Sequence, residues 1–86
     1  MNEPTRPKEG TQGQRLLDVL LKANGEWTNG QYFCRTMWLT QFHAVIFNLE
    51  NRYNWPIEHS TETDEFGFKS YRLAPEICEK YQVLEV

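Results

Sequence analysis

The sequence predicts a small α+β domain in which three helices precede a two-stranded hairpin. With 86 residues, the chain has room for one hydrophobic core. Its 40% hydrophobic and 14% aromatic residues are typical of a folded protein. Apolar residues recur at intervals of three and four before Pro56 and alternate after it, which indicates helices first and strands afterwards.

The first helix is expected directly after a polar N-terminal segment. Residues 1–10 are rich in proline and charge and lack periodicity, so we expect a flexible arm. Thr11 and Gln14 then form a capping box that opens a helix over Gln12–Ala23, and Asn24–Gly25 ends it. The buried side of this helix is expected to consist of Leu16, Leu17, Leu20 and Leu21.

Two more helices are expected, separated by a short turn. Glu26–Thr28 is long enough for one edge pairing in a sheet, and a second T-x-x-Q signature at Thr28–Gln31 opens a short helix over Asn29–Thr36. Thr40 is the expected cap of a third helix over Thr40–Tyr53. The expected buried residues are Tyr32, Phe33 and Met37 around the second helix, and Phe42, Val45, Ile46, Leu49 and Tyr53 on the third.

A hairpin and a short helix are expected after Pro56, which cannot continue the third helix. Strands are expected over Ile57–Thr61 and Phe66–Leu73, joined by an acidic tip, with Tyr71 and Leu73 facing inward. A last helical turn is expected over Pro75–Tyr81. The predicted organisation is therefore an arm at 1–10, a domain at 11–73 and a C-terminal extension at 74–86.

Helix, short strand, helix, turn, helix and hairpin is the order of a winged helix-turn-helix domain, with three helices and a two- to three-stranded β-wing. The run Thr40–Leu49 resembles a run in small helix-turn-helix proteins of phages and prophages, and it keeps the threonine, alanine, isoleucine and leucine. LLKANGEWTNGQ and the later SYRL are similar, more distantly, to the N-terminal domain of the biotin repressor. Where the phage family has two arginines, this chain has Gln41 and Val45.

The resemblance implies sequence-specific binding of double-stranded DNA in a transcriptional or DNA-transaction regulator. On a helical wheel, the side opposite the apolar stripe is rich in amides, and Gln41 and Asn48 are suited to bidentate pairing with adenine. His43 can meet guanine or phosphate, and Ala44 can touch a thymine methyl group. The candidate DNA-binding residues are Thr40, Gln41, His43, Ala44, Phe47, Asn48, Asn51 and Arg52 on the helix, with Lys69 and Arg72 on the hairpin.

Charge leaves a second interpretation open, in which the domain binds a protein. The net charge is −3; residues 1–53 hold six basic and five acidic side chains, whereas residues 54–86 hold three and seven. The carboxylates of the hairpin tip would repel a DNA backbone over about 8–10 Å. An exposed Phe47 is also typical of a contact with a second copy or another protein, unless it covers the base of the hairpin. Arg6 and Lys8 could instead bring the arm to a minor groove.

The residues do not indicate an enzyme, a cofactor or a metal site. His59 and Ser60 are adjacent on a strand and so point to opposite faces. The two cysteines and two histidines lack the spacing of zinc ligands. No apolar run approaches the roughly 20 residues of a membrane helix, and there is no secretory signal, so we expect a cytoplasmic protein with reduced Cys34 and Cys78.

Overall fold

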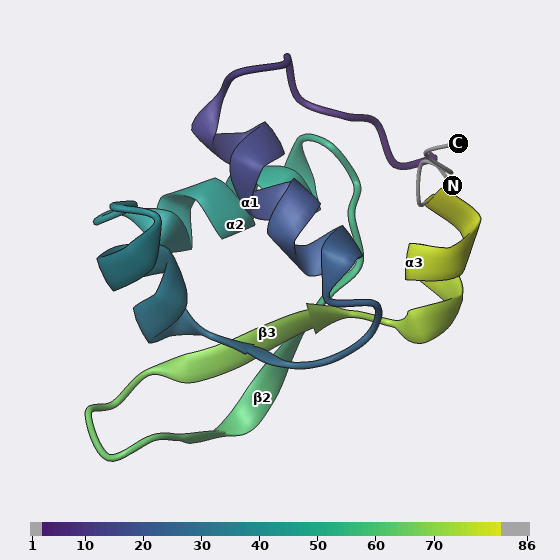
Figure 1. The fold of residues 1–86 in the computed structure, drawn as a ribbon. Coiled ribbons are helices and arrows are strands. Elements are labelled where there is room, and N and C mark those ends of the chain that lie inside the picture. Colours follow the sequence, from purple (N-terminus) through teal and green to yellow (C-terminus); the bar gives the residue numbers. More distant parts are fainter. Residues whose placement is uncertain (1–2, 82–86) are drawn as a thin grey trace.

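The computed structural model describes residues 3–81 and has the predicted α+β class. The elements are α1 (Gln12–Lys22), β1 (Thr28–Asn29), the π-helix η1 (Tyr32–Thr36), α2 (Phe42–Asn51), β2 (Ile57–Thr63), β3 (Lys69–Leu73) and α3 (Pro75–Tyr81). The strands form one antiparallel sheet, which lies below α1 and α2 in Figure 1, with α3 to its right. This order is compatible with the predicted winged helix-turn-helix.

The N-terminal boundary of α1 was predicted correctly. The Thr11 hydroxyl accepts a hydrogen bond from the Gln14 N–H (3.3 Å). The reciprocal half of the capping box is absent, because the Gln14 side chain donates to Asp18 Oδ1 (2.7 Å) instead. After the helix, Asn24 and Gly25 both have positive φ, as predicted. The four predicted leucines of α1 are buried.

The second helix differs from its prediction. Thr28 and Asn29 pair with β3 rather than opening a helix, and Asn29 Oδ1 accepts the Gln31 N–H (2.7 Å). The following turn is a π-helix, in which the Met37 N–H donates to the Tyr32 carbonyl. Phe33 and Met37 are buried, but Tyr32 is 42% exposed, because Phe33 takes the inner position and Tyr32 lies edge-on against its ring.

The third helix begins later than predicted, at Phe42. Thr40 does not cap it; Gln41 is the N-cap residue, and its side chain makes no capping hydrogen bond. The reason is the tight turn after η1, in which Leu39 is buried and its carbonyl accepts the Phe42 N–H (3.2 Å). The apolar stripe is otherwise as predicted, with Phe42, Ile46 and Leu49 buried and Val45 and Tyr53 partly buried against the core.

The sheet has the strand order β1-β3-β2. Both hairpin boundaries differ from the prediction, because β2 continues to Thr63 and β3 begins only at Lys69. The Asp64 carboxylate accepts the N–H groups of Phe66 and Phe68 (both 2.9 Å), so these residues form a turn rather than a strand. Tyr71 and Leu73 face the core, as predicted.

The segment before α1 lies along the body instead of extending as a flexible arm. The Thr5 N–H donates to the Tyr53 carbonyl (2.9 Å), and the Thr5 carbonyl accepts the indole N–H of Trp55 (2.6 Å). Pro7 is buried. Arg6 also donates to the carbonyl of Tyr81 at the end of α3 (2.8 Å). Helix α3 has the predicted bounds, and the predicted extension beyond Tyr81 lies outside the described residues.

Candidate nucleic-acid interface

Helix α2 presents the predicted face to solvent. All eight candidates around this helix are exposed, namely Thr40, Gln41, His43, Ala44, Phe47, Asn48, Asn51 and Arg52. They are exposed because the opposite side of the helix, through Phe42, Ile46 and Leu49, packs into the core. The structure therefore brings these residues together on one surface.

Two amides on this face have no partner within the part of the chain that the structure describes. The side chains of Gln41 and Asn48 make no hydrogen bond there, so their donors and acceptors are open to another molecule. Two further polar candidates are partly engaged. Asn51 donates to the Phe47 carbonyl (2.9 Å), and the His43 ring stacks on Phe42 with ring centroids 4.1 Å apart.

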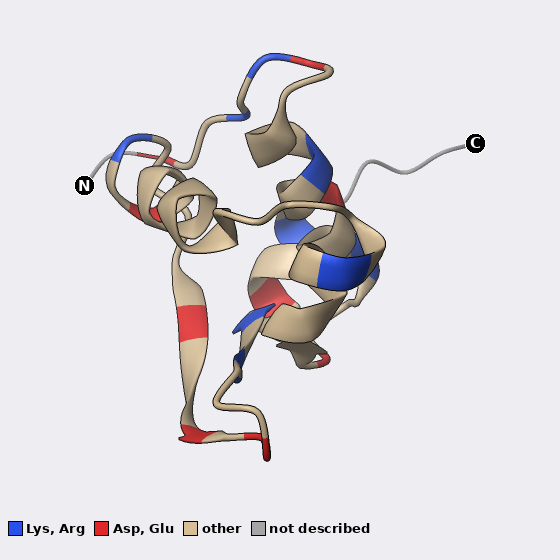
Figure 2. Cartoon of the chain, turned by 90° about the vertical axis from the view of Figure 1, so that its left-hand side faces the viewer, with Lys and Arg blue, Asp and Glu red and all other residues tan. Residues whose placement is uncertain are grey.

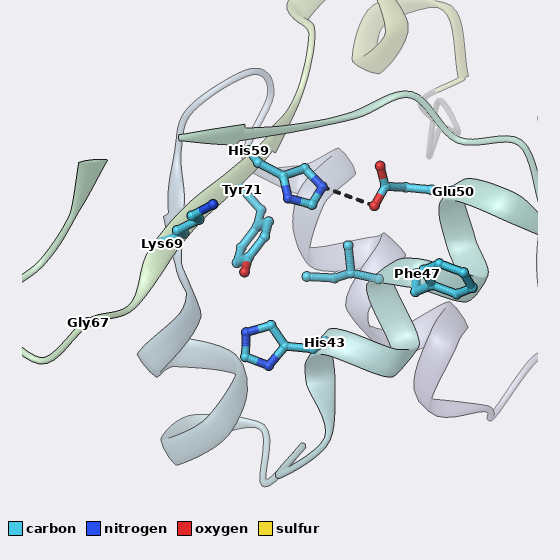
Figure 3. A pocket seen from close by; sticks show the side chains of 8 residues that line it. His43, Phe47, Glu50, His59, Gly67, Lys69 and Tyr71 are labelled. Carbon is cyan, nitrogen blue, oxygen red and sulfur yellow. Dashed lines mark hydrogen bonds and ion pairs between the residues drawn. The ribbon is translucent and has the colours of Figure 1, made fainter. Parts of the chain in front are cut away.

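A cleft of about 310 Å³ separates α2 from the hairpin (Figure 3). His43, Phe47 and Glu50 project from α2, and Lys69 and Tyr71 come from β3. Phe47 lines this cleft but remains 63% exposed, so it does not cover the base of the hairpin. Lys69 is exposed and makes no ion pair among residues 3–81, which leaves it as a free cation at the edge of the α2 surface.

A hydrogen bond between His59 and Glu50 links the hairpin to α2 across this cleft. His59 on β2 lies 3.0 Å from the Glu50 carboxylate, and its ring lies edge-on to Tyr71 with centroids 5.0 Å apart. Burial, and after it the negative charge of Glu50, raise the pKa of the Tyr71 phenol above its usual value. Tyr71 is therefore a neutral part of the cleft wall at physiological pH.

A second cleft, of about 520 Å³, lies on the other side of α2. It is formed by the segment 7–13 and by Val45, Asn48 and Tyr53. Lys8 is the one cation that lines it, and it is exposed and forms no ion pair within the described range. Helix α2 is thus a ridge between two clefts, each with a free lysine at its side.

Arg72 does not join this surface, although the sequence placed it there. Neighbouring strand residues alternate between faces, so Arg72 lies on the side of the sheet away from Lys69 and Tyr71. It pairs with Glu58 (3.0 Å), donates to the Gly25 carbonyl (3.3 Å) and lies over the Trp27 ring (4.8 Å to the centroid). These contacts occupy its charge within the fold.

Acidic residues gather at the hairpin tip (Figure 2), and one of them, Asp64, is held by hydrogen bonds within the fold. Besides two backbone N–H groups, the Asp64 carboxylate accepts the side-chain amides of Asn29 (3.1 Å) and Gln31. Desolvation acts in the opposite direction, but these hydrogen bonds together lower the pKa of Asp64 below 3.8. The tip is therefore attached to the end of β1 and to Gln31 just before η1, and Asp64 stays charged over the physiological range.

Three features of this surface were not found by sequence reasoning. Trp38, in the turn before α2, is 80% exposed and has a φ of 60°. Arg15 on α1 donates to the Met37 carbonyl (3.4 Å) beside that turn. No carboxylate occurs between Trp27 and Leu49, which was readable in the sequence as a gap in an otherwise acidic chain. The backbone conformation of Trp38 and the position of Arg15 had no signal in the sequence.

Comparison with protein-family models, curated proteins and solved structures gave no match. Within residues 3–81 there is no group of three His, Cys, Asp or Glu side chains that could hold a metal ion. None of the described helices is long and apolar enough to cross a membrane.

Proposed function

We propose that this protein is a winged-helix DNA-binding protein, a small phage- or prophage-type transcriptional or DNA-transaction regulator, that reads duplex DNA with α2. The observation that carries the proposal is the ridge of α2, where Gln41 and Asn48 are exposed and without partners. An unsatisfied amide on a helix is the group that pairs with adenine in the major groove. Ala44, exposed between them, is small enough to meet a thymine methyl group.

The two clefts support this proposal through their positions. The major groove is about 12 Å wide and is bordered by two phosphate backbones, so a helix within it needs cations on both sides. Lys69 lies in the cleft on one side of α2 and Lys8 in the cleft on the other. Arg52, exposed just after the last turn of α2, adds a third positive charge.

The distribution of carboxylates supports it as well, despite the net charge of −3. The stretch Trp27–Leu49, which includes η1 and most of α2, contains no carboxylate. Glu50, the next acidic residue, lies 3.0 Å from the His59 ring on the hairpin side of the helix. The stretch Trp27–Leu49 itself therefore has no carboxylate that would repel the phosphates of a docked duplex.

The test is binding of a fluorescent pool of random duplexes at low salt, followed by selection of a preferred site. We expect micromolar binding to the pool that weakens steeply with salt. On the selected site, Asn48→Ala should cost about 1–3 kcal/mol, which is about 5- to 150-fold in affinity. Glu79→Ala, at an exposed position on α3, is the matched control and should bind normally. Absence of any binding to the pool at low salt would refute the proposal.

A second candidate function, a protein-interaction module, is favoured by exposed aromatic residues. Phe47 and Trp38 are 63% and 80% exposed, and an exposed large apolar side chain is typical of a contact with another protein when it belongs to a larger patch. Under this alternative the domain does not bind DNA strongly, and Phe47→Asp would abolish a homodimer or a complex with another protein. Light scattering that gives the monomer mass at every concentration would exclude the homodimer.

A further inference from the structure

Trp38 has a conformation and an exposure that the fold does not explain. It lies in the turn between η1 and α2 with a φ of 60°, and 80% of its surface is exposed. A left-handed backbone is unfavourable for a bulky residue, and Gly or Asn is the usual occupant of such a position. Within the described residues its indole makes no hydrogen bond or ring contact.

The two other tryptophans show how the fold uses this side chain when it needs one. Trp55 is 2% exposed, and its N–H donates to the Thr5 carbonyl. Trp27, at 47% exposure, is covered on one side by the Arg72 guanidinium. Trp38 has neither kind of contact, so its side chain does not contribute to the stability of the domain in the way these two do.

A cation lies beside the Trp38 backbone, and the chain on both sides of Trp38 lacks carboxylates. The Arg15 guanidinium donates to the carbonyl of Met37, the residue before Trp38. No acidic residue occurs in the chain from Trp27 to Leu49. An exposed indole favours a partner with an apolar surface, and the nearby Arg15 guanidinium favours a partner with negative charge. The stretch Trp27–Leu49 has no carboxylate that would repel such a partner. The sugar–phosphate backbone of DNA has both properties.

We infer that Trp38 contacts one DNA backbone at the edge of the groove that α2 enters, with its ring on a deoxyribose and its indole N–H directed to a phosphate, while Arg15 pairs with a neighbouring phosphate. The inference rests on the proposed function and identifies further residues of the same interface. The turn before a reading helix is close to the backbone because the helix N-terminus points into the groove. Trp38 is only four positions before Phe42, the first residue of α2.

The test uses substitutions that suit a left-handed backbone, so that stability and binding can be separated. Trp38→Gly and Trp38→Asn both accept positive φ. We expect each variant to keep or raise the melting temperature and to lose at least about fivefold in affinity for the random duplex pool, the low end of what removing an aromatic contact to nucleic acid costs. Arg15→Gln should reduce the slope of log K against log salt by about one. Trp27→Ala, which also removes an exposed indole but on the other face of the sheet, is the control and should bind as the natural protein does.

The possible outcomes distinguish failure of the Trp38 inference from failure of the proposed DNA-binding function. If the natural protein does not bind the pool at low salt, both proposals fail. If it binds, and Asn48→Ala weakens the selected complex while both Trp38 variants bind normally, only the Trp38 inference fails. A lower melting temperature in both Trp38 variants would overturn it by assigning Trp38 a structural role. A change from dimer to monomer in these variants would overturn it in favour of a protein contact.

Discussion

The η1–α2 unit and the hairpin tip differ in how their polar groups are used. On α2, the Gln41 and Asn48 side chains have no partner within residues 3–81. At the hairpin tip, the Asp64 carboxylate accepts four hydrogen bonds, two of them from Asn29 in β1 and Gln31 just before η1. The Asp64 carboxylate thus holds parts of the fold together, whereas the Gln41 and Asn48 side chains make no such contact among the described residues.

This difference also changes the meaning of the acidic hairpin. The sequence predicts that its carboxylates repel a DNA backbone. In the structure, the Asp64 carboxylate is hydrogen-bonded to Asn29 and Gln31. Arg35 on η1 also lies 5.8 Å from the ring centroid of Phe66 at the same tip. Asp64 and its hydrogen bonds to Asn29 and Gln31 form a clamp that attaches the hairpin tip to the chain before η1. Glu62 and Glu65 are the exposed acidic residues of the tip.

The largest expected effect comes from two neighbours on α2 that lie on opposite sides of the helix. Leu49 is completely buried, so Leu49→Ala should lower the free energy of unfolding by about 2–5 kcal/mol. Asn48→Ala, one residue earlier, should change it by no more than about 0.5 kcal/mol, because Asn48 is exposed and without a partner. Urea unfolding of the two variants measures the difference. Equal losses would mean that Asn48 supports the fold and is not reserved for a partner.

Much of the fold was predictable because it depends on local patterns. The leucines of α1, the stripe on α2 and the alternation around Tyr71 each have the period of one secondary structure, so their buried sides follow directly. Thr11 was found as a cap for the same reason. The predictions were wrong where residues distant in the sequence determine the local structure. Asn29 pairs with β3 instead of starting a helix, and the Thr5 carbonyl accepts a hydrogen bond from Trp55, which is 50 positions away in the chain.

The candidate site was predictable only as far as one helix face is concerned. A helical wheel of the α2 sequence predicted which residues are exposed, because the apolar residues on the opposite side are buried in the core. Arg72 was misplaced because its partners Glu58 and Gly25 are distant in sequence, and counting charges does not show which are paired. Trp38 was missed because no residue preference indicates a positive φ for tryptophan.

A smaller effect is expected when the clamp at the tip is opened. In Asp64→Asn, one oxygen can still accept the N–H groups of Phe66 and Phe68, but the new amide nitrogen would face the donors of Asn29 and Gln31. The melting temperature should fall. Glu65→Gln, an exposed carboxylate of the same tip, is the matched control and should leave it nearly unchanged. A similar melting temperature in both variants would show that Asp64 does not clamp the hairpin.

The pH dependence of the same pair sharpens this test. Because the pKa of Asp64 is lower in the folded state than its ordinary value of 3.8, its contribution to stability is present above about pH 4 and is lost as the pH falls through the folded pKa. The difference in melting temperature between the natural protein and Asp64→Asn should therefore be greatest near neutral pH and shrink below pH 4. A difference that is constant down to pH 2 would contradict the assignment.

The smallest expected effect concerns the two acids of the tip that are exposed. If α2 enters a major groove, the hairpin approaches a flanking backbone, and Glu62 and Glu65 repel it through solvent over about one Debye length. The double change Glu62→Gln and Glu65→Gln should raise duplex affinity about two- to threefold at low salt, and the gain should vanish near 1 M salt, where the Debye length is about 3 Å. Fluorescence anisotropy at several salt concentrations measures it. Because neither glutamate has an ion-pair partner among residues 3–81, the change removes repulsion without breaking a contact of the fold. An unchanged affinity at low salt would mean that the hairpin points away from the duplex, and Lys69 would then be too distant from it to serve as a phosphate contact.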